Sequence, residues 1–231
     1  MLTVNQLPDS RRAILVALKQ QGSATIAQLA DLLQLTGEAV RQQLLQLQRD
    51  GWIEAHIDRA QAEKARTGRP ATTYTLTEAG DHLFPKQYDA LNVAMIDAVA
   101  DELGPAALMK VLERLSDARV ASVEPTLRGK SLEEKVTLLK SWYLEDDPYM
   151  EIARGADGDF RLMERNCPFL NTAMRRPALC TVSVNALSRL LGVRVRRDEK
   201  FQTGHGRCVF HVYADEPIDP KNWEFRAERP L

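Results

Sequence analysis

The sequence has few cysteines, no long apolar run and almost no net charge. Its 231 residues include only three cysteines, and this odd number argues against a disulfide framework. No apolar run approaches the roughly 20 residues that span a bilayer. The first residues, MLTVNQLPDSRR, lack the basic-then-apolar order of a signal peptide. We therefore expect a cytoplasmic protein that makes no membrane contact.

Catalytic signatures are also missing. The chain has no glycine-rich phosphate loop, no nucleophile elbow and no C-x-x-x-C-x-x-C motif of the kind found in radical enzymes. Paired acids such as Glu133-Glu134 lie at predicted helix ends, where charge is solvated or caps the helix. The sequence thus predicts that the protein is not an enzyme, and its length allows two modest domains.

The net charge of −1 does not by itself indicate a nucleic-acid partner. Within residues 1–85, basic and acidic side chains balance at nine each. Such a region binds DNA only if its positive charge gathers on one face. A prediction of DNA binding must therefore come from the pattern of residues.

Residues 1–85 have the pattern of a winged helix-turn-helix domain. A helix predicted over residues 10–21 ends at Gly22, and a capping box of Thr25 and Gln28 begins the next helix. After a short break at Leu35-Thr36-Gly37, a helix over residues 38–49 buries one apolar stripe and exposes a polar face. Two short helices joined by a tight turn form the groove-reading unit of many DNA-binding proteins.

A basic hairpin is predicted to follow and to form the wing. Its strands cover residues 51–55 and 72–77, with a polar stretch between them. The basic tip is expected to contact phosphates and the minor groove, while arginine and glutamine of the helix read guanine and adenine. The predicted DNA-facing residues are Thr36, Glu38, Arg41, Gln42, Arg49, Lys64, Arg66 and Arg69. The alternative interpretation of this region is a small helical module for protein interaction.

Residues 86–145 are predicted to be a helical dimerisation segment. Amphipathic helices over residues 86–102 and from 105 to about 123 are separated at Gly104-Pro105, and a capping box of Ser131 and Glu134 begins a third helix. Such apolar stripes usually pack within their own domain. Because half-site recognition normally needs two DNA-reading domains, we expect a homodimer on a palindromic operator in double-stranded DNA.

Residues 146–231 are predicted to form an α+β domain with a small antiparallel sheet. A hairpin over residues 149–154 and 160–164 is followed by helices over 169–175 and 177–191 and by strands over 193–197 and 208–213. The predicted fold class of the whole chain is therefore α+β. With Pro168 as a first helical residue, Cys167 is expected at a helix N-terminus, where the helix dipole favours the thiolate.

The three cysteines, Cys167, Cys180 and Cys208, fall within 42 residues and are separated by twelve and twenty-seven residues. A single free cysteine is usually a small buried apolar residue. Three of them, each at the edge of a predicted element, favour a shared site. The spacing fits neither a C-x-x-C zinc ribbon nor a C-x-x-C redox pair, and three thiolates suit a soft or iron-containing centre.

Several short motifs surround these cysteines and the predicted wing, namely Gly68-Arg69-Pro70, Tyr74-Thr-Leu-Thr77, Asn166-Cys167-Pro168-Phe169, Leu179-Cys180, Leu190-Leu-Gly192 and Gly206-Arg-Cys208. With them the chain resembles the SufR-type iron–sulfur transcriptional regulators of bacteria over nearly its whole length. The resemblance implies a homodimeric repressor of cluster-assembly genes. It also implies that the three cysteines hold an iron–sulfur cluster that governs operator affinity, [4Fe–4S] in preference to [2Fe–2S].

The resemblance leaves the fourth cluster ligand open. The cyanobacterial pattern has a further cysteine where this chain reads Gly192-Val193-Arg194. Protein candidates are His205, His211, Glu164 and Asn166, and water, a small thiol or a vacant iron are equally suitable. His211 is expected on the strand face opposite Cys208, because an offset of three residues reverses the side. A structural zinc site and a cofactor-free thiol switch are the competing hypotheses.

Overall fold

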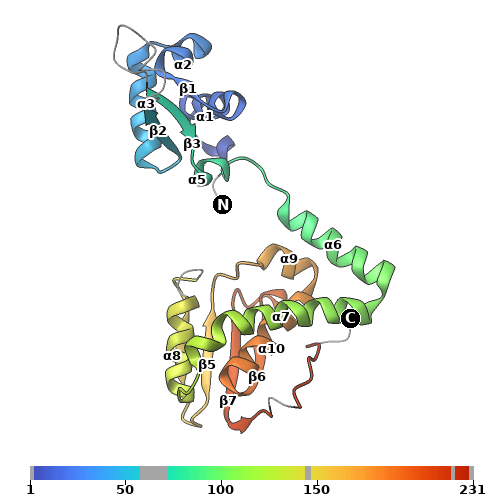
Figure 1. The fold of residues 1–231 in the computed structure, drawn as a ribbon. Coiled ribbons are helices and arrows are strands. Elements are labelled where there is room, and N and C mark those ends of the chain that lie inside the picture. The colour runs from blue at the N-terminus through green and yellow to red at the C-terminus, as the bar shows by residue number, and fades with distance from the viewer. Residues whose placement is uncertain (1–2, 58–71, 144–146, 220–221, 229–231) are drawn as a thin grey trace. The chain divides into compact units, whose positions relative to one another are not determined.

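The computed structural model describes residues 3–57, 72–143, 147–219 and 222–228. The chain divides into two compact units, Met1–Gln87 and Tyr88–Leu231, which are called the head and the C-terminal unit below. Figure 1 shows the elements of each unit. The finer predicted division, with boundaries at residues 85 and 145, stays a prediction.

The described part of the head combines helices with a small antiparallel sheet of strand order β1-β3-β2. Its elements are η1(Val4–Gln6), α1(Asp9–Gln21), β1(Ala24–Thr25), α2(Ile26–Leu33), α3(Gly37–Arg49), β2(Ile53–Ile57), β3(Thr72–Leu76) and α5(Glu78–Asp81). The predicted helix-turn-helix and the two wing strands are present. Strand β1, whose Ala24 pairs with Tyr74 of β3, was not predicted.

Local signals in the sequence account for these elements. The capping box of α2 is confirmed, since the backbone N–H of Gln28 donates to Thr25 Oγ1 at 3.2 Å and the backbone N–H of Thr25 donates to Gln28 Oε1 at 2.8 Å. Gly22 ends α1 with a φ of 75°, a conformation that glycine adopts without strain. The apolar stripes of α1, α2 and α3 meet in one core, in which Leu44 and Leu47 are fully buried.

The C-terminal unit begins with helices and continues with a four-stranded antiparallel sheet of order β4-β5-β7-β6. Its elements are α6(Tyr88–Leu103), α7(Pro105–Leu127), α8(Leu132–Tyr143), β4(Glu151–Arg154), β5(Phe160–Glu164), α9(Leu170–Arg175), η2(Pro177–Leu179), α10(Cys180–Leu191), β6(Val193–Glu199), η3(Phe201–Thr203) and β7(Cys208–Pro217). The predicted α+β class is confirmed, and so is the capping box of Ser131 and Glu134.

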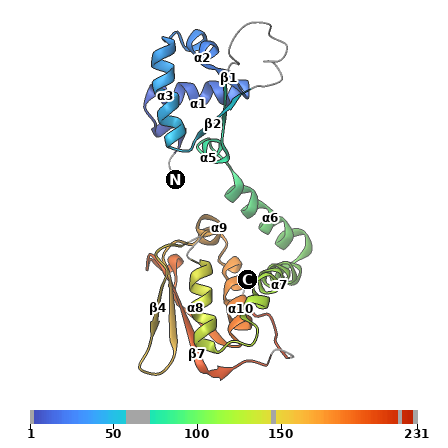
Figure 2. The ribbon, with the colours of Figure 1, turned by 60° about the vertical axis from the view of Figure 1, so that its left-hand side comes forward.

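One face of this sheet packs against α7, α8 and α10 and encloses the core of the unit (Figure 2). Side chains alternate along the strands, so Leu162 of β5 and Phe210 of β7 share the core-facing side. The same row ends with the directly paired Glu164 and Cys208. The fold therefore places a carboxylate and a thiol at positions where apolar side chains would continue the core.

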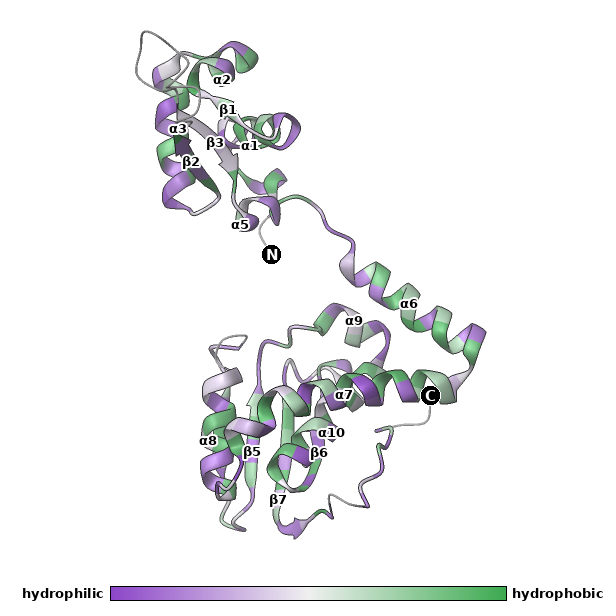
Figure 3. Cartoon of the chain, in the orientation of Figure 1, coloured by the Kyte–Doolittle hydropathy of each residue, from purple (hydrophilic) through white to green (hydrophobic). Residues whose placement is uncertain are grey.

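Polar and apolar residues alternate along α6 and α7 (Figure 3). On α6, Val93 is buried, whereas Tyr88, Leu91 and Met95 are about three-fifths exposed at 61%, 58% and 59%. Within the described ranges, no helix combines the length and the apolar character needed to cross a membrane.

Candidate metal centre and nucleic-acid interface

The fold brings the three cysteines together from three different elements. Cys167 lies in the loop after β5, Cys180 is the first residue of α10, and Cys208 is the first residue of β7. Negative charge on Cys180 or on Cys208 raises the pKa of Cys167, so the three thiols lie near one another. Cys180 and Cys208 are buried, and Cys167 is partly exposed.

Buried polar groups fix the loop that carries Cys167. Asp147, which is fully buried, accepts the backbone N–H of Tyr149 at 3.0 Å and that of Arg165 at 2.6 Å. This carboxylate therefore ties the start of the β4 region to the end of β5. The loop then turns at Cys167, whose carbonyl accepts the N–H of Leu170 at 3.1 Å.

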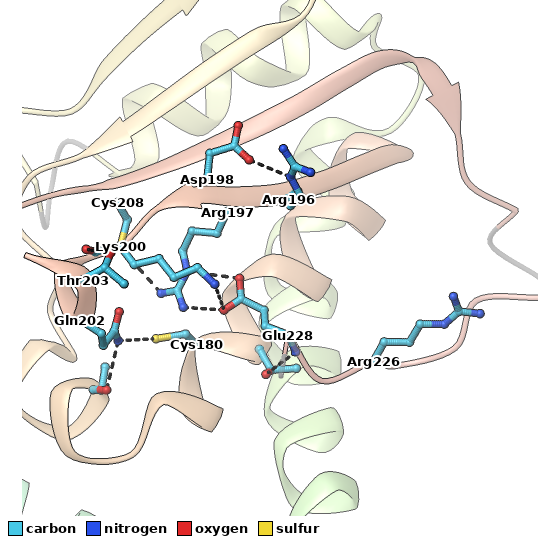
Figure 4. A network of polar contacts seen from close by, with 12 residues as sticks. Cys180, Arg196, Arg197, Asp198, Lys200, Gln202, Thr203, Cys208, Arg226 and Glu228 are labelled. Atoms are coloured by element: carbon cyan, nitrogen blue, oxygen red, sulfur yellow. Dashed lines mark hydrogen bonds and ion pairs between the residues drawn. The ribbon is translucent and has the colours of Figure 1, made fainter. Parts of the chain in front are cut away.

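A buried guanidinium lies between two of the thiols. Figure 4 shows Arg197 of β6 among Cys180, Cys208 and Glu228, and the side chain of Arg197 is only 4% exposed. Its Nη1 lies 3.7 Å from the sulfur of Cys208, its Nε donates to Glu228 Oε1 at 3.2 Å, and it also hydrogen-bonds Cys180. Burial opposes its charge, but Cys180, Glu228 and Cys208 raise the pKa of Arg197 above its ordinary value.

A second donor reaches the sulfur of Cys180 from η3 (Figure 4). Gln202 Nε2 donates to Cys180 Sγ at 3.3 Å and to the carbonyl of Ala173 at 3.1 Å. The buried Oε1 of Gln202 has no hydrogen-bond partner within the described part of the chain. Hydrogen bonds to sulfur tune iron–sulfur centres, so Gln202 and Arg197 form a suitable surrounding for thiolate ligands.

Burial favours the protonated form of two of the thiols, Cys167 and Cys208, in the metal-free protein by raising their pKa values. Burial and the charge of Glu164 raise the pKa of Cys167 to about 12, and burial also raises the pKa of Cys208. The prediction that a helix N-terminus favours the thiolate of Cys167 is wrong. Helix α9 begins at Leu170, beyond Cys167, and the desolvation of the buried sulfur outweighs the backbone hydrogen bond from Phe169.

Three cysteines and a glutamate form a donor set that could hold a metal centre. If the three thiolates and the Glu164 carboxylate all bound a metal centre, its positive charge, together with that of Arg197, would offset their four negative charges. Among the described residues, Asp157, Asp159 and His211 also bring one ligand atom each within 4.8 Å of one another.

Two predicted alternatives for the fourth ligand have other hydrogen-bond partners. His205 is exposed, and its Nδ1 lies 2.8 Å from the hydroxyl of Thr203. The ring of His211 lies between Asp159, at 2.6 Å from Nε2, and Asp198, at 3.2 Å from Nδ1. Alternation along β7 places this ring on the sheet face opposite Cys208.

The predicted DNA-facing residues of the helix lie on the exposed side of α3. Thr36 caps this helix by accepting the Ala39 N–H at 3.2 Å. Glu38 accepts a hydrogen bond from Gln42 at 3.0 Å and lies 3.5 Å from Arg41, and both partners are exposed. Arg49, also exposed, is the last residue of the helix. These side chains are therefore available to a duplex, although base contacts stay a prediction.

The predicted wing is described only at its base. Strands β2 and β3 pair antiparallel from Ile53 with Leu76 to Ile57 with Thr72, as a hairpin requires. The predicted contacts Lys64, Arg66 and Arg69 lie outside the described residues.

Arg197, Gln202 and Glu228 belong to the site but were not predicted. One of them carried a signal in the sequence. Val193, Val195 and Arg197 share one face of β6, so the arginine falls at a position where alternation calls for a core residue. Gln202 reaches Cys180, and Glu228 reaches Arg197, only through tertiary contacts, and no local pattern marks either residue.

Comparison with known proteins supports the assignment of the head. A sequence model for a family described as winged helix-turn-helix DNA-binding matches residues 7–54, which run from the start of the head into β2. No curated protein and no solved structure matches the chain. The head is therefore a winged helix-turn-helix DNA-binding domain.

Proposed function

We propose that this protein is a transcriptional regulator whose operator affinity is controlled by an iron–sulfur cluster held by Cys167, Cys180 and Cys208. The observation that carries the proposal is the convergence of the three cysteines, two of which contact the buried Arg197, in a chain with a DNA-binding head. The resemblance to SufR-type regulators supports the finer proposal of a homodimeric repressor of cluster-assembly genes. It favours [4Fe–4S] over [2Fe–2S].

A bound cluster would supply a centre that oxidants and iron shortage can remove, which gives the protein two states. Residues of the chain would stabilise the negatively charged ligands of that centre inside the fold. Arg197 offsets negative charge at Cys180 and Cys208, and Gln202 directs an N–H toward the Cys180 sulfur. The pairing of Arg197 with Glu228 holds the guanidinium in place when the thiols are protonated.

Helix α9 supplies a mechanical connection between the cysteines and α6. It lies between Cys167 and Cys180 in the chain, and two polar contacts join its region to α6. Asn171 donates to Asp89 at 2.7 Å, and Arg176 forms a bidentate ion pair with Asp97. Ligation of both cysteines restrains the two ends of the α9 segment, and α9 in turn restrains α6.

Helix α6 is the element through which this restraint reaches the DNA-binding head. It is the first element of the C-terminal unit and follows the last residue of the head directly in the chain. Allosteric couplings are typically about 1–3 kcal/mol, or about 5- to 150-fold in affinity. We expect an effect of this size on operator binding.

The exposed apolar stripe of α6 supports the proposal of a dimer. Tyr88, Leu91 and Met95 are spaced by three and four residues and therefore lie on one side of the helix. Val111 and Leu115 form a similar exposed pair on α7. A two-fold interface through these side chains would hold two heads together for the two half-sites of an operator.

The central test is anaerobic purification followed by iron, sulfide and zinc analysis. Operator affinity is then measured for loaded and metal-free protein, on a duplex selected from a random library. We expect iron with sulfide and different affinities for the two forms. Zinc without sulfide would favour the structural zinc site, and the absence of metal would favour the thiol switch. Equal affinity of the loaded and metal-free forms contradicts control by the cluster.

Replacing one ligand separates regulation from folding. We expect Cys180→Ser to lose iron and sulfide and to bind the operator like metal-free wild type, because the head does not depend on that thiol. Ser183→Ala on the same helix is the matched control and should keep its metal. Loss of the folded state in the metal-free Cys180→Ser protein would instead favour a structural metal.

The connection through α9 is tested by Arg176→Gln and Asp97→Asn. Each variant should keep its iron and sulfide content but show a smaller difference in affinity between loaded and metal-free protein. An unchanged difference in both variants would rule out this connection.

The dimer is tested by Leu91→Glu, which should shift sedimentation toward the monomer and weaken operator binding. Tyr149→Glu, at an exposed apolar position outside α6 and α7, is the control. A monomeric wild-type protein, or a Leu91→Glu dimer, would contradict an interface on α6.

A further inference from the structure

Glu164 occupies an unusual place on the sheet. Along β5, Phe160, Leu162 and Glu164 share the buried side, and the first two belong to the core of the C-terminal unit. Glu164 continues this apolar row and is only 7% exposed. Burying a carboxylate is costly unless a charged or hydrogen-bonding group compensates it. Its buried position therefore indicates that the Glu164 carboxylate interacts with a polar or charged group on the core side of the sheet.

The register places Glu164 beside the thiols. It pairs directly with Cys208 on β7, so the two side chains lie on the same face at the distance of cross-strand neighbours. Cys167 follows only three residues later, where the chain turns out of β5. The negative charge of Glu164 acts on both Cys167 and Cys208, which agrees with this placement.

We propose that the carboxylate of Glu164 is the fourth protein ligand of the cluster. This inference rests on the proposed iron–sulfur function and names the ligand that the three cysteines leave open. The rival side chains are less suitably placed. Asn166 and His205 are exposed, and His211 lies between Asp159 and Asp198 on the opposite face of the sheet.

A carboxylate is a chemically suitable ligand for one iron of such a centre. Carboxylate oxygens bind iron in many proteins, but they are harder ligands than thiolates. One iron would thus be held less firmly than the three bound by cysteine. The Glu164-bound iron is then the position from which the cluster loses metal first, so Glu164 sets the sensitivity of the regulator to oxidants and to external thiols.

The test compares full-length wild type with Glu164→Gln, Glu164→Cys and the control Glu199→Gln. Glu199 is a half-buried glutamate of the same sheet, and it pairs with Arg207 at 2.6 Å. All four proteins are reconstituted anaerobically with ferrous iron and sulfide. The readouts are iron and sulfide per chain, visible absorption before and after addition of 2-mercaptoethanol, and the rate of bleaching in air.

We expect Glu164→Gln to bleach at least about tenfold faster than wild type, in line with the effects of weakened metal-site contacts. It should also change its spectrum on addition of 2-mercaptoethanol, because the fourth iron becomes open to an external thiol. Glu164→Cys should keep its iron, absorb at shifted wavelengths and bleach more slowly than wild type. The Glu199→Gln control should behave as wild type.

The outcomes distinguish this inference from the function on which it rests. Absence of iron and sulfide in wild type and control would overturn the proposed function. If wild type contains iron and sulfide but Glu164→Gln bleaches and responds to thiol as wild type does, only the assignment of Glu164 as the fourth ligand would be overturned. If Glu164→Gln does not fold, Glu164→Cys decides, since a purely structural role for the carboxylate predicts that the cysteine variant loses its cluster.

Discussion

The head and the C-terminal unit use their polar residues in opposite ways. Among the described residues, every buried polar or charged side chain lies in the C-terminal unit, including Glu164, Asn185 and Arg197. The core of the head is built from apolar side chains, and its candidate DNA contacts are exposed on α3. The head thus exposes its candidate functional side chains to a partner, whereas the C-terminal unit buries its own.

This difference has a physical reason. A DNA duplex is read by side chains that stay hydrated until the complex forms, so the reading residues need only a stable helix beneath them. A thiolate-bound metal centre needs fixed donors and restricted solvent access, because hydrogen bonds to sulfur and burial tune it. Replacing an exposed DNA-reading residue of the head should therefore change the stability little. Replacing a buried polar residue of the C-terminal unit should lower the stability of that unit.

The largest effect is expected in the core of the head. Leu44→Ala should lower the free energy of unfolding of the head by about 2–5 kcal/mol, because Leu44 is 1% exposed and its loss leaves a cavity. Urea denaturation followed by circular dichroism measures the change. The neighbouring Leu45→Ala, at a position that is 45% exposed, is the control and should have little effect. Equal destabilisation by both substitutions would contradict the assigned core.

The next effect concerns the buried ion pair of the C-terminal unit. Arg197→Met should destabilise this unit by about 3 kcal/mol in the metal-free protein, since the mostly buried carboxylate of Glu228 loses Arg197 and keeps Lys200, at 3.7 Å, as its ionic partner among the described residues. The double variant Arg197→Met with Glu228→Gln should recover most of the loss, because no lone charge remains. Urea unfolding of single and double variants provides the measurement, and no recovery in the double variant would argue against the pair.

A smaller effect is expected on the exposed face of α3. Arg41→Ala should weaken operator binding by about 1–3 kcal/mol if Arg41 reads a base, and it should leave iron content and stability unchanged. The control is Arg12→Ala on α1, where an exposed arginine pairs with Asp9 at 2.6 Å. Fluorescence anisotropy with labelled duplex measures the affinity of both variants. Equal affinities of Arg41→Ala and Arg12→Ala would show that Arg41 does not contact a base.

The smallest effect is a pH dependence confined to the head. Hydrogen bonds from Lys19 and Lys86 lower the pKa of Asp81 from 3.8 to about 2. Because the folded pKa lies below the unfolded one, the stabilisation is complete above about pH 4 and is lost as the pH falls toward 2. Asp81→Asn should remove this part of the acid sensitivity, as measured by the melting temperature of the head between pH 5 and 2. If the melting temperatures of Asp81→Asn and wild type fall in parallel with pH, the lowered pKa of Asp81 does not contribute to the acid sensitivity.

Local elements were predictable because their signals are local. The capping boxes at Thr25 and Ser131, the glycine at the end of α1 and the alternation of β5 each act over a few residues. The pairing of β1 with β3 was missed because it joins residues about fifty positions apart and includes only two residues of β1. The end of the β7 strand was also missed, since its last residues are stabilised by pairing with β6.

The sequence by itself determined that a DNA-binding head precedes a region rich in clustered cysteines, because periodicity, caps and spacing are properties of the chain. Only the tertiary structure decided what surrounds those cysteines. Arg197 and Gln202 reach them from a strand and a short helix, and Glu228 of the C-terminal segment pairs with Arg197. Glu164 and Cys208 became neighbours through strand register. Such contacts depend on how segments distant in the sequence pair and pack, which is determined by the whole core and not by any local pattern.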